Sequence, residues 1–390
     1  MTDLERKALL PAGLRDILPP EAAFEAEICE TLAADFGSHG YDRVKPPLVE
    51  FEDSLTSGAG AAVSADTFRL MDPVSQRMMG VRADMTTQVA RIALTRLTDT
   101  PRPLRLSYTG EVLRVRGTQL RPERQFAQVG AELIGAESAE ADIEIIAIAV
   151  ASLRKIGVPH LSVDLTIPPL VPALMEAMPL GDDEYRALRD ALDRKDVRSV
   201  SEHGGDHVEA LCSLMDGTGP AMTALEVLSG LSLPGAPAKE LNRLLVVVEG
   251  LGHRLPDLDI TVDPVENRGF EYHTGVGFTF FSRGERGEIG GGGRYIATLN
   301  GADAGNDNGE AATGFTLYVD NIMRVLPSPA TRLRVYVPPG VPSGDLADLR
   351  NDGWVTVAGF DDTEDASAEA RRLKCSHVWA SGRAEPLKQG

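Results

Sequence analysis

Hydrophobic residues recur at helical spacing in several stretches of the chain. Between residues 20 and 39, Phe24, Ile28, Leu32 and Phe36 follow one another at every fourth position, so they lie on one face of an α-helix. Two prolines precede this stretch and glycines follow it, which fits the start and the end of a helix. The same kind of spacing predicts further helices over residues 84–97 and 139–156.

Shorter stretches that are rich in β-branched and aromatic residues predict β-strands. Residues 104–116 and 125–134 are predicted to form a hairpin with a polar loop. Residues 41–50 form an extended segment whose prolines suit the edge of a sheet. Residues 314–326 are predicted to form a closing helix or a strand–helix element. Additional strands are predicted at residues 67–71, 76–81, 161–165, 260–265, 276–281 and 287–289.

The order of these elements predicts two domains. The first, residues 1–326, is expected to be an α+β domain in which an antiparallel sheet carries flanking helices. Within it, residues 169–256 are rich in Leu, Ala and Glu and show few strand signals, which predicts a helical insertion. A short linker leads to residues 332–390, where strands and helices alternate in a βαβαβ pattern that predicts a small α/β domain.

The charge balance of the chain is acidic. Its 390 residues include 39 Lys and Arg against 58 Asp and Glu, a formal net charge of −19. Proteins that bind nucleic acid usually present a basic face to the phosphates, so this balance argues against tRNA binding. The N-terminus has no apolar signal-peptide run, and no apolar stretch is long enough to cross a bilayer. With three widely separated cysteines, we expect a cytoplasmic protein with reduced thiols and no membrane association.

A run of four glycines, Gly290 to Gly293, precedes an Arg-Tyr pair. Glycine has no Cβ, so such a run lets the backbone approach a ligand closely. The run lacks the spacing of phosphate-binding loops and of dinucleotide folds. We therefore expect it to line a pocket, and we expect no cofactor.

Two further segments carry residues suited to binding a free amino acid. Such a ligand needs carboxylates for its ammonium group, and a cation or backbone donors for its own carboxylate. Asp84 and Glu132, with the amide oxygen of Gln128, supply acceptors for the ammonium group. The even spacing of Gln128 and Glu132 places them on one face of a strand. The alternative is that they form the solvent face of the hairpin. Arg268, followed by an aromatic pair, is either a carboxylate clamp or a surface arginine in a turn.

A metal site is not expected. His203 and His207 are spaced as a zinc-binding pair on a helix would be. The two glycines between them disfavour a helix at that place, and the other histidines are scattered along the chain.

Taken together and in this order, the segments resemble histidyl-tRNA synthetase, a class II aminoacyl-tRNA synthetase, over about residues 9–326. The resemblance implies a class II synthetase-like fold with a histidine pocket. It also implies that the C-terminal segment is similar to a shortened anticodon-binding domain. The matching segments are residues 11–17 (the family's N-terminal PxGxxD segment), 40–50 (motif 1, the dimerisation strand), 81–86 (its RPE(G)T segment), 113–132 (motif 2) and 268–273 (its second histidine-specific segment).

Three departures from the synthetase pattern fall on positions that serve ATP in that family. Motif 2 of the family contains Arg-x-Glu, and Arg116 stands in the place of the Glu. Later in the same loop the family has Gly-Arg-Tyr, where residues 121–123 are Arg-Pro-Glu. Motif 3 ends in Gly-Leu-Glu-Arg, whose arginine clamps the nucleotide, and residues 318–321 are Tyr-Val-Asp-Asn. Without that cation the transferring phosphate is poorly neutralised, so we expect no independent catalysis.

A chain that keeps a histidine pocket and loses the ATP groups is similar to the regulatory-subunit family of ATP phosphoribosyltransferase, the first enzyme of histidine biosynthesis. This resemblance implies a dimer that assembles with a short-form catalytic subunit into a hetero-octamer of four regulatory and four catalytic chains. It also implies that the chain activates the catalytic subunit and mediates feedback inhibition by histidine, without tRNA.

The resemblance also implies which residues bind histidine. No catalytic residue and no metal ligand is expected among them. Two alternatives stay open: a divergent histidyl-tRNA synthetase, which would catalyse histidine-dependent ATP–pyrophosphate exchange, and a tRNA-sensing synthetase-like protein. The expected histidine-binding residues are Asp84, Thr86, Arg114, Gln128, Glu132, Arg268, Tyr272, His273 and the backbone of Gly291, Gly292 and Gly293.

Overall fold

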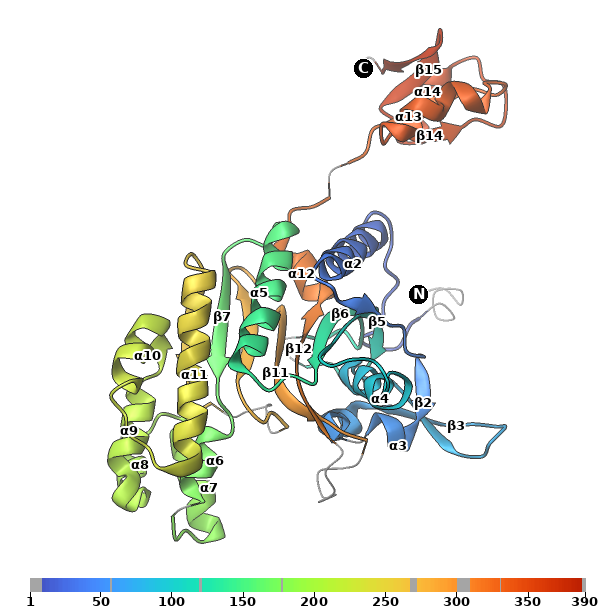
Figure 1. Cartoon of the computed structure of the whole chain (residues 1–390). Helices are drawn as coiled ribbons and strands as arrows, with labels where there is room; N and C mark the ends of the chain where they lie inside the picture. The colour runs from blue at the N-terminus through green and yellow to red at the C-terminus, as the bar shows by residue number, and fades with distance from the viewer. Residues whose placement is uncertain are drawn as a thin grey trace. The chain divides into compact units, whose positions relative to one another are not determined.

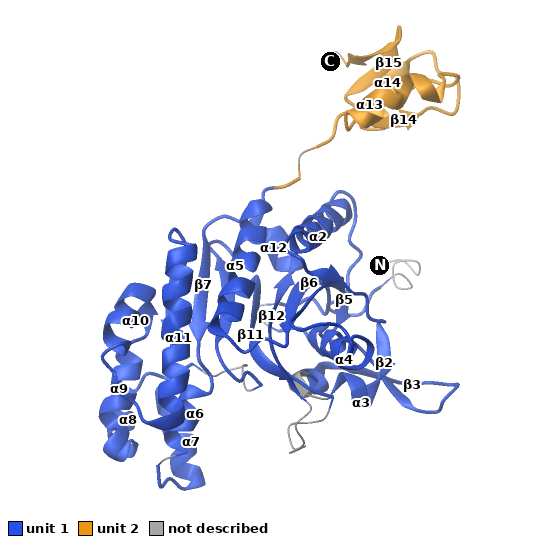
Figure 2. Cartoon of the chain, viewed as in Figure 1, with its two compact units in different colours: residues 1–327 blue, residues 328–390 orange. Residues whose placement is uncertain are grey.

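The computed structural model describes residues 9–56, 58–118, 121–176, 178–266, 272–299, 309–329 and 331–387. The chain divides into two compact units, residues 1–327 and residues 328–390 (Figure 2). In the part of the chain that the structure describes, every helix is too short or too polar to span a membrane.

The first unit is built on a nine-stranded sheet (Figure 1). In the order in which they pair, its strands are β1 (Asp42–Arg43), β5 (Leu104–Leu113), β6 (Gln125–Ile134), β12 (Glu310–Tyr318), β11 (Gly290–Ala297), β10 (Gly277–Ser282), β7 (Leu161–Thr166), β9 (Asp259–Asp263) and β8 (Gly219–Pro220). The pairs β1–β5 and β7–β9 are parallel, and the other neighbouring pairs are antiparallel. The α+β architecture with a mainly antiparallel sheet, predicted from the sequence, is confirmed.

A three-stranded antiparallel sheet and several helices accompany the large sheet. The segment predicted as one extended stretch, residues 41–50, is divided between β1 in the large sheet and β2 in the small one, with two prolines in between. Proline donates no ladder hydrogen bond, so the strand is interrupted there. These elements are β2 (Val49–Phe51), β3 (Phe68–Met71), β4 (Met78–Val81), α2 (Glu21–Ser38), α3 (Glu52–Leu55), the 3-10 helix η1 (Gly58–Asp66), α4 (Thr86–Arg96), α5 (Ala139–Lys155) and α12 (Val319–Val325).

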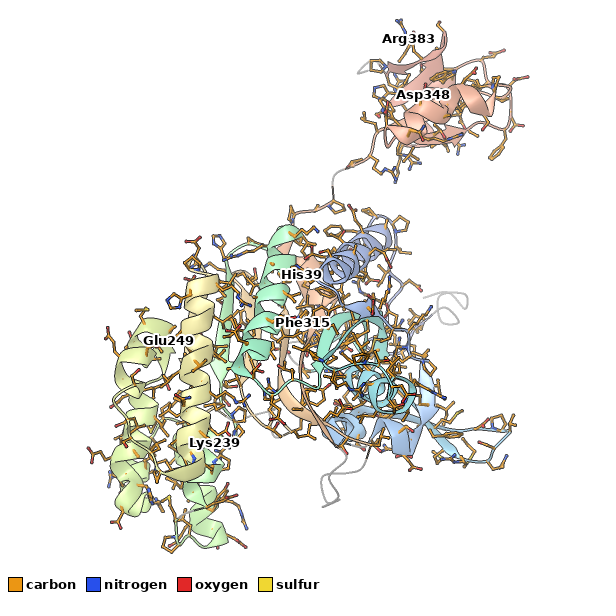
Figure 3. The ribbon with its side chains drawn as sticks, viewed as in Figure 1. His39, Lys239, Glu249, Phe315, Asp348 and Arg383 are labelled. Atoms are coloured by element: carbon orange, nitrogen blue, oxygen red, sulfur yellow. The ribbon has the colours of Figure 1, made fainter. Side chains whose placement is uncertain are left out.

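One face of the large sheet is apolar and carries the main core. On β6, Val129, Ala131 and Leu133 are buried in the same cluster as residues of α2 and α5, because alternate residues of a strand point to the same side. Phe315 of β12, labelled in Figure 3, packs edge-to-face against Phe36 of α2, with ring centroids 5.3 Å apart. The opposite face carries a second hydrophobic cluster, in which Phe126 of β6 and Ala312 of β12 pack with Val89 of α4, and it also carries polar residues such as Gln128 and Glu132.

A group of helices lies between β7 and β9 in the sequence (Figure 1). The longest of these helices, α11 (Gly235–Arg254), packs against α5. Its buried aliphatic residues include Leu244, Val248 and Leu251. His203 ends one helix and His207 lies in the following 3-10 turn, so the two histidines share no helix. The helices are α6 (Leu170–Met175), α7 (Asp182–Asp193), α8 (Val197–His203), the 3-10 helix η2 (Gly205–His207), α9 (Val208–Asp216), α10 (Ala221–Leu228) and α11 (Gly235–Arg254).

The second unit contains a four-stranded sheet with short helices. Its strands, in pairing order, are β14 (Val355–Ala358), β13 (Arg334–Val337), β15 (His377–Ala380) and β16 (Arg383–Pro386), and its helices are the 3-10 helix η3 (Ser343–Leu346), α13 (Ala347–Asn351) and α14 (Ala366–Arg372). The first three strands are parallel, joined by helical crossovers, and β16 adds to β15 in antiparallel direction. The βαβαβ pattern was predicted from the sequence, whereas β16 was not.

One predicted strand was misplaced. The sequence places a strand at residues 287–289 and leaves the glycine run outside it, but β11 begins at Gly290 and includes all four glycines. Glycine has a low strand propensity, which explains the error. In the structure these glycines pair with β10 on one side and β12 on the other. The backbone hydrogen bonds to these two strands outweigh the low strand propensity of glycine.

Candidate functional site

A cavity of about 480 Å³ lies over the face of the large sheet that carries Glu132. Side chains from β6, β7, β10, β11 and β12 and from the start of α4 line it. This volume falls in the range of about 300–1,000 Å³ that is common for small-molecule sites.

Glycines on adjacent strands make room for the cavity. Gly293 of β11 lies opposite Gly314 of β12. A Cβ added at Gly314 would overlap the carboxylate of Glu132, and one at Gly293 would lie 2.7 Å from Nε2 of His273. Gly291, Gly292 and Gly293 all line the cavity. The missing side chains thus turn the centre of the sheet into the floor of a pocket.

Asp84 and Gln128 form a hydrogen-bonded pair at one end of the cavity. The Gln128 side-chain amide donates to Oδ2 of Asp84 at 3.0 Å, and Oδ1 of Asp84 accepts from the backbone N–H of Thr86 at 2.8 Å. Gln128 is fully buried and Glu132 is 1% exposed, so the interpretation of these residues as a solvent face is wrong. Oε1 of Gln128 has no hydrogen-bond partner among the described residues.

Glu132 lies beside this pair, under two tyrosines. The hydroxyl of Tyr295 donates to Oε2 of Glu132 at 3.0 Å, and the hydroxyl of Tyr108 lies 3.5 Å from Oε1. Burial raises the pKa of Glu132 to about 8. A ligand that brings a positive charge or N–H donors would favour the ionised form of this carboxylate.

Tyr272 and His273 form an aromatic wall of the same cavity. Their ring centroids are 4.3 Å apart. Burial lowers the pKa of His273 to about 3, so its imidazole is neutral at physiological pH. The expected carboxylate clamp, Arg268, lies outside the described residues.

Two expected residues, Arg114 and Gln128, do not line the cavity. Gln128 contacts it only through its hydrogen bond to Asp84, and Arg114 is placed differently. Its Nε donates to the carbonyl of Ala83 at 3.3 Å, and its guanidinium carbon lies 5.2 Å from the centre of the Phe126 ring. Arg114 therefore positions the chain next to Asp84, while Asp84, Thr86, Glu132, Tyr272 and His273 line the cavity itself.

The cavity is strongly acidic. Five carboxylates line it, those of Asp84, Glu132, Asp164, Glu266 and Glu288, and its described lining includes no Lys or Arg. A cavity lined by one sign of charge attracts ligands of the opposite sign. It therefore suits a ligand with cationic and hydrogen-bond-donating groups better than a polyphosphate.

The side chains at the positions that departed from the synthetase pattern make contacts within the protein. Nδ2 of Asn321 donates to the carbonyl of Glu288 at 2.7 Å. The guanidinium carbon of Arg121 lies 3.7 Å from the centre of the Tyr318 ring, and its Nε lies 3.7 Å from Oδ2 of Asp320. Arg116 is exposed. These contacts hold the wall of the cavity together.

Several cavity residues were not predicted from the sequence. Tyr295 lines the cavity and binds Glu132, and Tyr108 approaches Glu132 from outside the lining. Asp164 and Thr166 belong to a strand predicted only as a structural element. Alternation along each strand would have placed them on the cavity side, but only after the pairing register was known. Arg294, next to the glycine run, points elsewhere: it forms a buried ion pair with Asp142 at 2.8 Å.

Sequence comparisons identify close relatives over nearly the whole chain. The family model described as histidyl-tRNA synthetase matches residues 13–322. The ATP phosphoribosyltransferase regulatory subunit of Rhodospirillum centenum is 52% identical over 381 residues, which are 98% of this chain and 97% of that protein. The protein of the same name from Paramagnetospirillum magneticum is also 52% identical, over 97% of both chains.

Solved structures show the same fold. A Bacillus halodurans protein described as an ATP phosphoribosyltransferase regulatory subunit/histidyl-tRNA synthetase aligns with a TM-score of 0.77 at 24% identity, covering 94% of this chain and 96% of that one. A histidyl-tRNA synthetase from a Nostoc species aligns with a TM-score of 0.75 at 18% identity, covering 95% and 90%. At these identities the likeness establishes the class II synthetase fold.

Proposed function

This chain belongs to the family of ATP phosphoribosyltransferase regulatory subunits, which has the histidyl-tRNA synthetase fold, and we propose that it activates a short-form catalytic subunit and makes it sensitive to histidine. In this proposal histidine is the effector and binds in the acidic cavity. The chain itself catalyses no step of the transfer.

The observation that carries the proposal is the cavity around Glu132. Asp84 and Glu132 present carboxylate oxygens to the cavity. Gln128, which donates to Asp84 from outside the lining, keeps an unpartnered buried oxygen among the described residues. Histidine has an ammonium group and an imidazole N–H to donate to them. The rings of Tyr272 and His273, tilted by 48° to each other, offer aromatic contacts to the imidazole ring.

A non-catalytic role agrees with the contacts at the former ATP positions. Adenylate formation needs cations that neutralise the transferring phosphate. Asn321 replaces the arginine of the synthetase pattern and binds a backbone carbonyl, while Arg121 faces the carboxylate of Asp320. The described lining of the cavity adds five carboxylates and no basic residue, which would repel ATP.

The second unit supports a role without tRNA. It resembles a shortened anticodon-binding domain, and two of its segments, residues 345–348 and 361–365, carry exposed acidic side chains. A basic face would be expected for phosphate binding. The acidic side chains are those of Asp345, Asp348, Asp361, Asp362, Glu364 and Asp365.

The proposed regulation requires that histidine change the chain's interaction with its partner. An allosteric ligand acts through contacts that differ between two states. In the ligand-free cavity, Glu132 is buried and its pKa is raised to about 8. Histidine would supply the positive charge that this carboxylate lacks, and we propose that the resulting rearrangement is transmitted to the interface within a complex of four regulatory and four catalytic chains.

A reconstitution experiment tests the proposal. The chain and the short-form catalytic subunit from the same source are purified, and ATP phosphoribosyl transfer is measured for each alone and for the mixture, with and without histidine. Activation on mixing, and suppression of that activity by histidine, is the expected result. If mixing gives neither activation nor a stable complex, the proposal is wrong.

A further inference from the structure

The far end of the cavity is built by residues of two neighbouring strands. On β7, Asp164 and Thr166 are two positions apart and share a face. On β10, Thr279 pairs with Asp164, and Gly277 pairs with Thr166. Asp164, Thr166 and Thr279 all line the cavity. They lie across β10, β11 and β12 from Glu132 of β6, because these strands separate β7 from β6 in the sheet.

Thr166 has a buried hydroxyl group that forms no hydrogen bond with the described residues. Its side chain is 2% exposed, and Oγ1 has no hydrogen-bond partner among the described residues. Leaving a buried hydroxyl without a partner costs about 1–3 kcal/mol, so such groups are usually satisfied by water, an ion or a ligand. Because Thr166 lines the cavity, its hydroxyl group is placed to form a hydrogen bond with a ligand there.

Asp164 lies next to Thr166 and is only partly satisfied by the protein. Its Oδ1 accepts a hydrogen bond from Thr261 at 2.7 Å. Burial raises the pKa of Asp164, and the nearby carboxylates of Asp263 and Glu266 raise it further, while Lys195 lowers it. The ammonium of Lys195 is bound to Asp263 at 2.6 Å. Among the described residues, Asp164 therefore has no basic partner of its own.

We propose that Asp164, Thr166 and Thr279 form a second compartment of the cavity, which binds the ammonium group of a small primary amine beside the effector. A primary ammonium group has three N–H donors, and the compartment offers one carboxylate and two hydroxyl oxygens. The inference extends the proposed function, because it assigns the Glu132 end of the cavity to histidine. The cavity, at about 480 Å³, is larger than one amino acid requires.

Other occupants fit the compartment less well. A phosphorylated ligand would face Asp164, Glu266 and Glu288 without a basic residue in the described lining. Among the described residues, no group of three or more His, Cys, Asp or Glu is arranged to hold a metal ion. The ammonium group of an amine needs hydrogen-bond acceptors, and the carboxylate and hydroxyl oxygens of the compartment provide them.

The test uses the full chain and simple amines. Binding of methylammonium and of 1,4-diaminobutane is measured by isothermal titration calorimetry, with tetramethylammonium as a cation that has no N–H donors. Histidine is titrated in the same preparations. Variants are Asp164→Asn, Thr166→Val and Thr166→Ser, and the control is Asp259→Asn, which removes an exposed carboxylate at the start of β9.

The expected result is that the primary amines bind to the wild type and that tetramethylammonium does not. D164N and T166V should weaken amine binding roughly tenfold or more, since a charge-assisted hydrogen bond is lost. T166S and D259N should bind the amines as the wild type does, and histidine binding should persist in all four variants.

The inference would be overturned by absence of amine binding to the wild type, or by equal amine binding by wild type and D164N. Displacement of the amines by histidine, with D164N unaffected, would place them at the Glu132 end and would also overturn it. Failure of histidine to bind to the wild type would instead refute the proposed function. The two failures are therefore distinguishable.

Discussion

The hydroxyl of Tyr295 donates a hydrogen bond to the carboxylate of Glu132, at 3.0 Å, although the two residues are 163 positions apart in the sequence. Tyr295 follows the glycine run of β11, and Glu132 lies on β6, with β12 between them. The contact is possible because Gly314 of β12 has no side chain to separate the two groups. The position of Glu132 thus depends on the absence of a side chain at Gly314.

Gly314→Ala tests this dependence. The added Cβ would overlap the Glu132 carboxylate and also approach the backbone of Ala131, so the carboxylate must move. We expect histidine binding, measured by calorimetry, to weaken roughly tenfold or more, while the chain still folds and assembles. Gly252→Ala is the matched control, because no heavy atom lies within 4 Å of its added Cβ. Unaltered histidine binding in G314A would show that this carboxylate is not needed.

The stability of the ligand-free chain should depend on pH through Glu132. Burial raises its pKa from 4.5 to about 8, so between these values the folded chain holds a proton that the unfolded chain releases. The stability associated with this group is complete below about pH 4.5 and is lost as the pH rises through about 8. Between these limits, the free energy of unfolding of the wild type should fall relative to that of Glu132→Gln, by up to about 1.4 kcal/mol per pH unit.

Urea unfolding followed by circular dichroism measures this difference. Both tryptophans, Trp354 and Trp379, belong to the second unit, so tryptophan fluorescence would not report on the unit that contains Glu132. Parallel pH profiles for the wild type and E132Q would mean that the pKa of Glu132 is not raised.

Arg294 should contribute to stability and not directly to ligand binding. It is 4% exposed, and its guanidinium pairs with the fully buried Asp142. Removing one member of a buried pair costs about 3–5 kcal/mol when the other charge is left uncompensated. Arg243 still lies 3.4 Å from Asp142, so we expect the lower end of this range. Arg294→Met should therefore lower the free energy of unfolding by about that amount. Arg254→Met, which breaks the exposed pair with Glu140, should cost less than about 1 kcal/mol. Equal losses in the two variants would contradict this assignment.

The chain should not activate histidine for aminoacylation. Asn321 and Arg121 contact other residues of the protein, and the described lining of the cavity is acidic. No basic side chain in that lining is therefore available to bind the phosphates of ATP. Histidine-dependent ATP–pyrophosphate exchange should stay at the level of a blank without protein, under conditions in which a histidyl-tRNA synthetase is active. Exchange that depends on this chain would establish the synthetase alternative.

Much of the fold could be predicted because single strands and helices carry their own pattern. The alternation of Val129, Ala131 and Leu133 with Gln128 marks one strand with two different faces, and the structure confirms this. The predicted helix with Ile28, Leu32 and Phe36 on one side is α2, and all three residues are buried. Such a pattern shows which side of a single helix or strand is buried, and it can be recognised without knowing the neighbouring elements.

The parts of the fold and of the cavity that could not be predicted depend on contacts between segments that are distant in the sequence. The glycines of β11 look like a loop until their pairing with β10 and β12 is known. Strand β16 has the sequence Arg-Ala-Glu-Pro, which gives little strand signal, and it forms only by pairing with β15. Asp164 and Thr166 look like ordinary polar positions of a strand, and the sheet order alone shows that they face the same cavity as Glu132.

The most direct test of the account is histidine inhibition of the reconstituted transferase with the E132Q chain in place of the wild type. The substitution keeps the shape of the side chain and removes its charge, so activation of the catalytic subunit should be retained. The histidine concentration for half-maximal inhibition should rise roughly tenfold or more, as expected when a charge-assisted hydrogen bond is lost. Inhibition by the same histidine concentrations in both complexes would contradict the claim that histidine regulates the enzyme from this cavity.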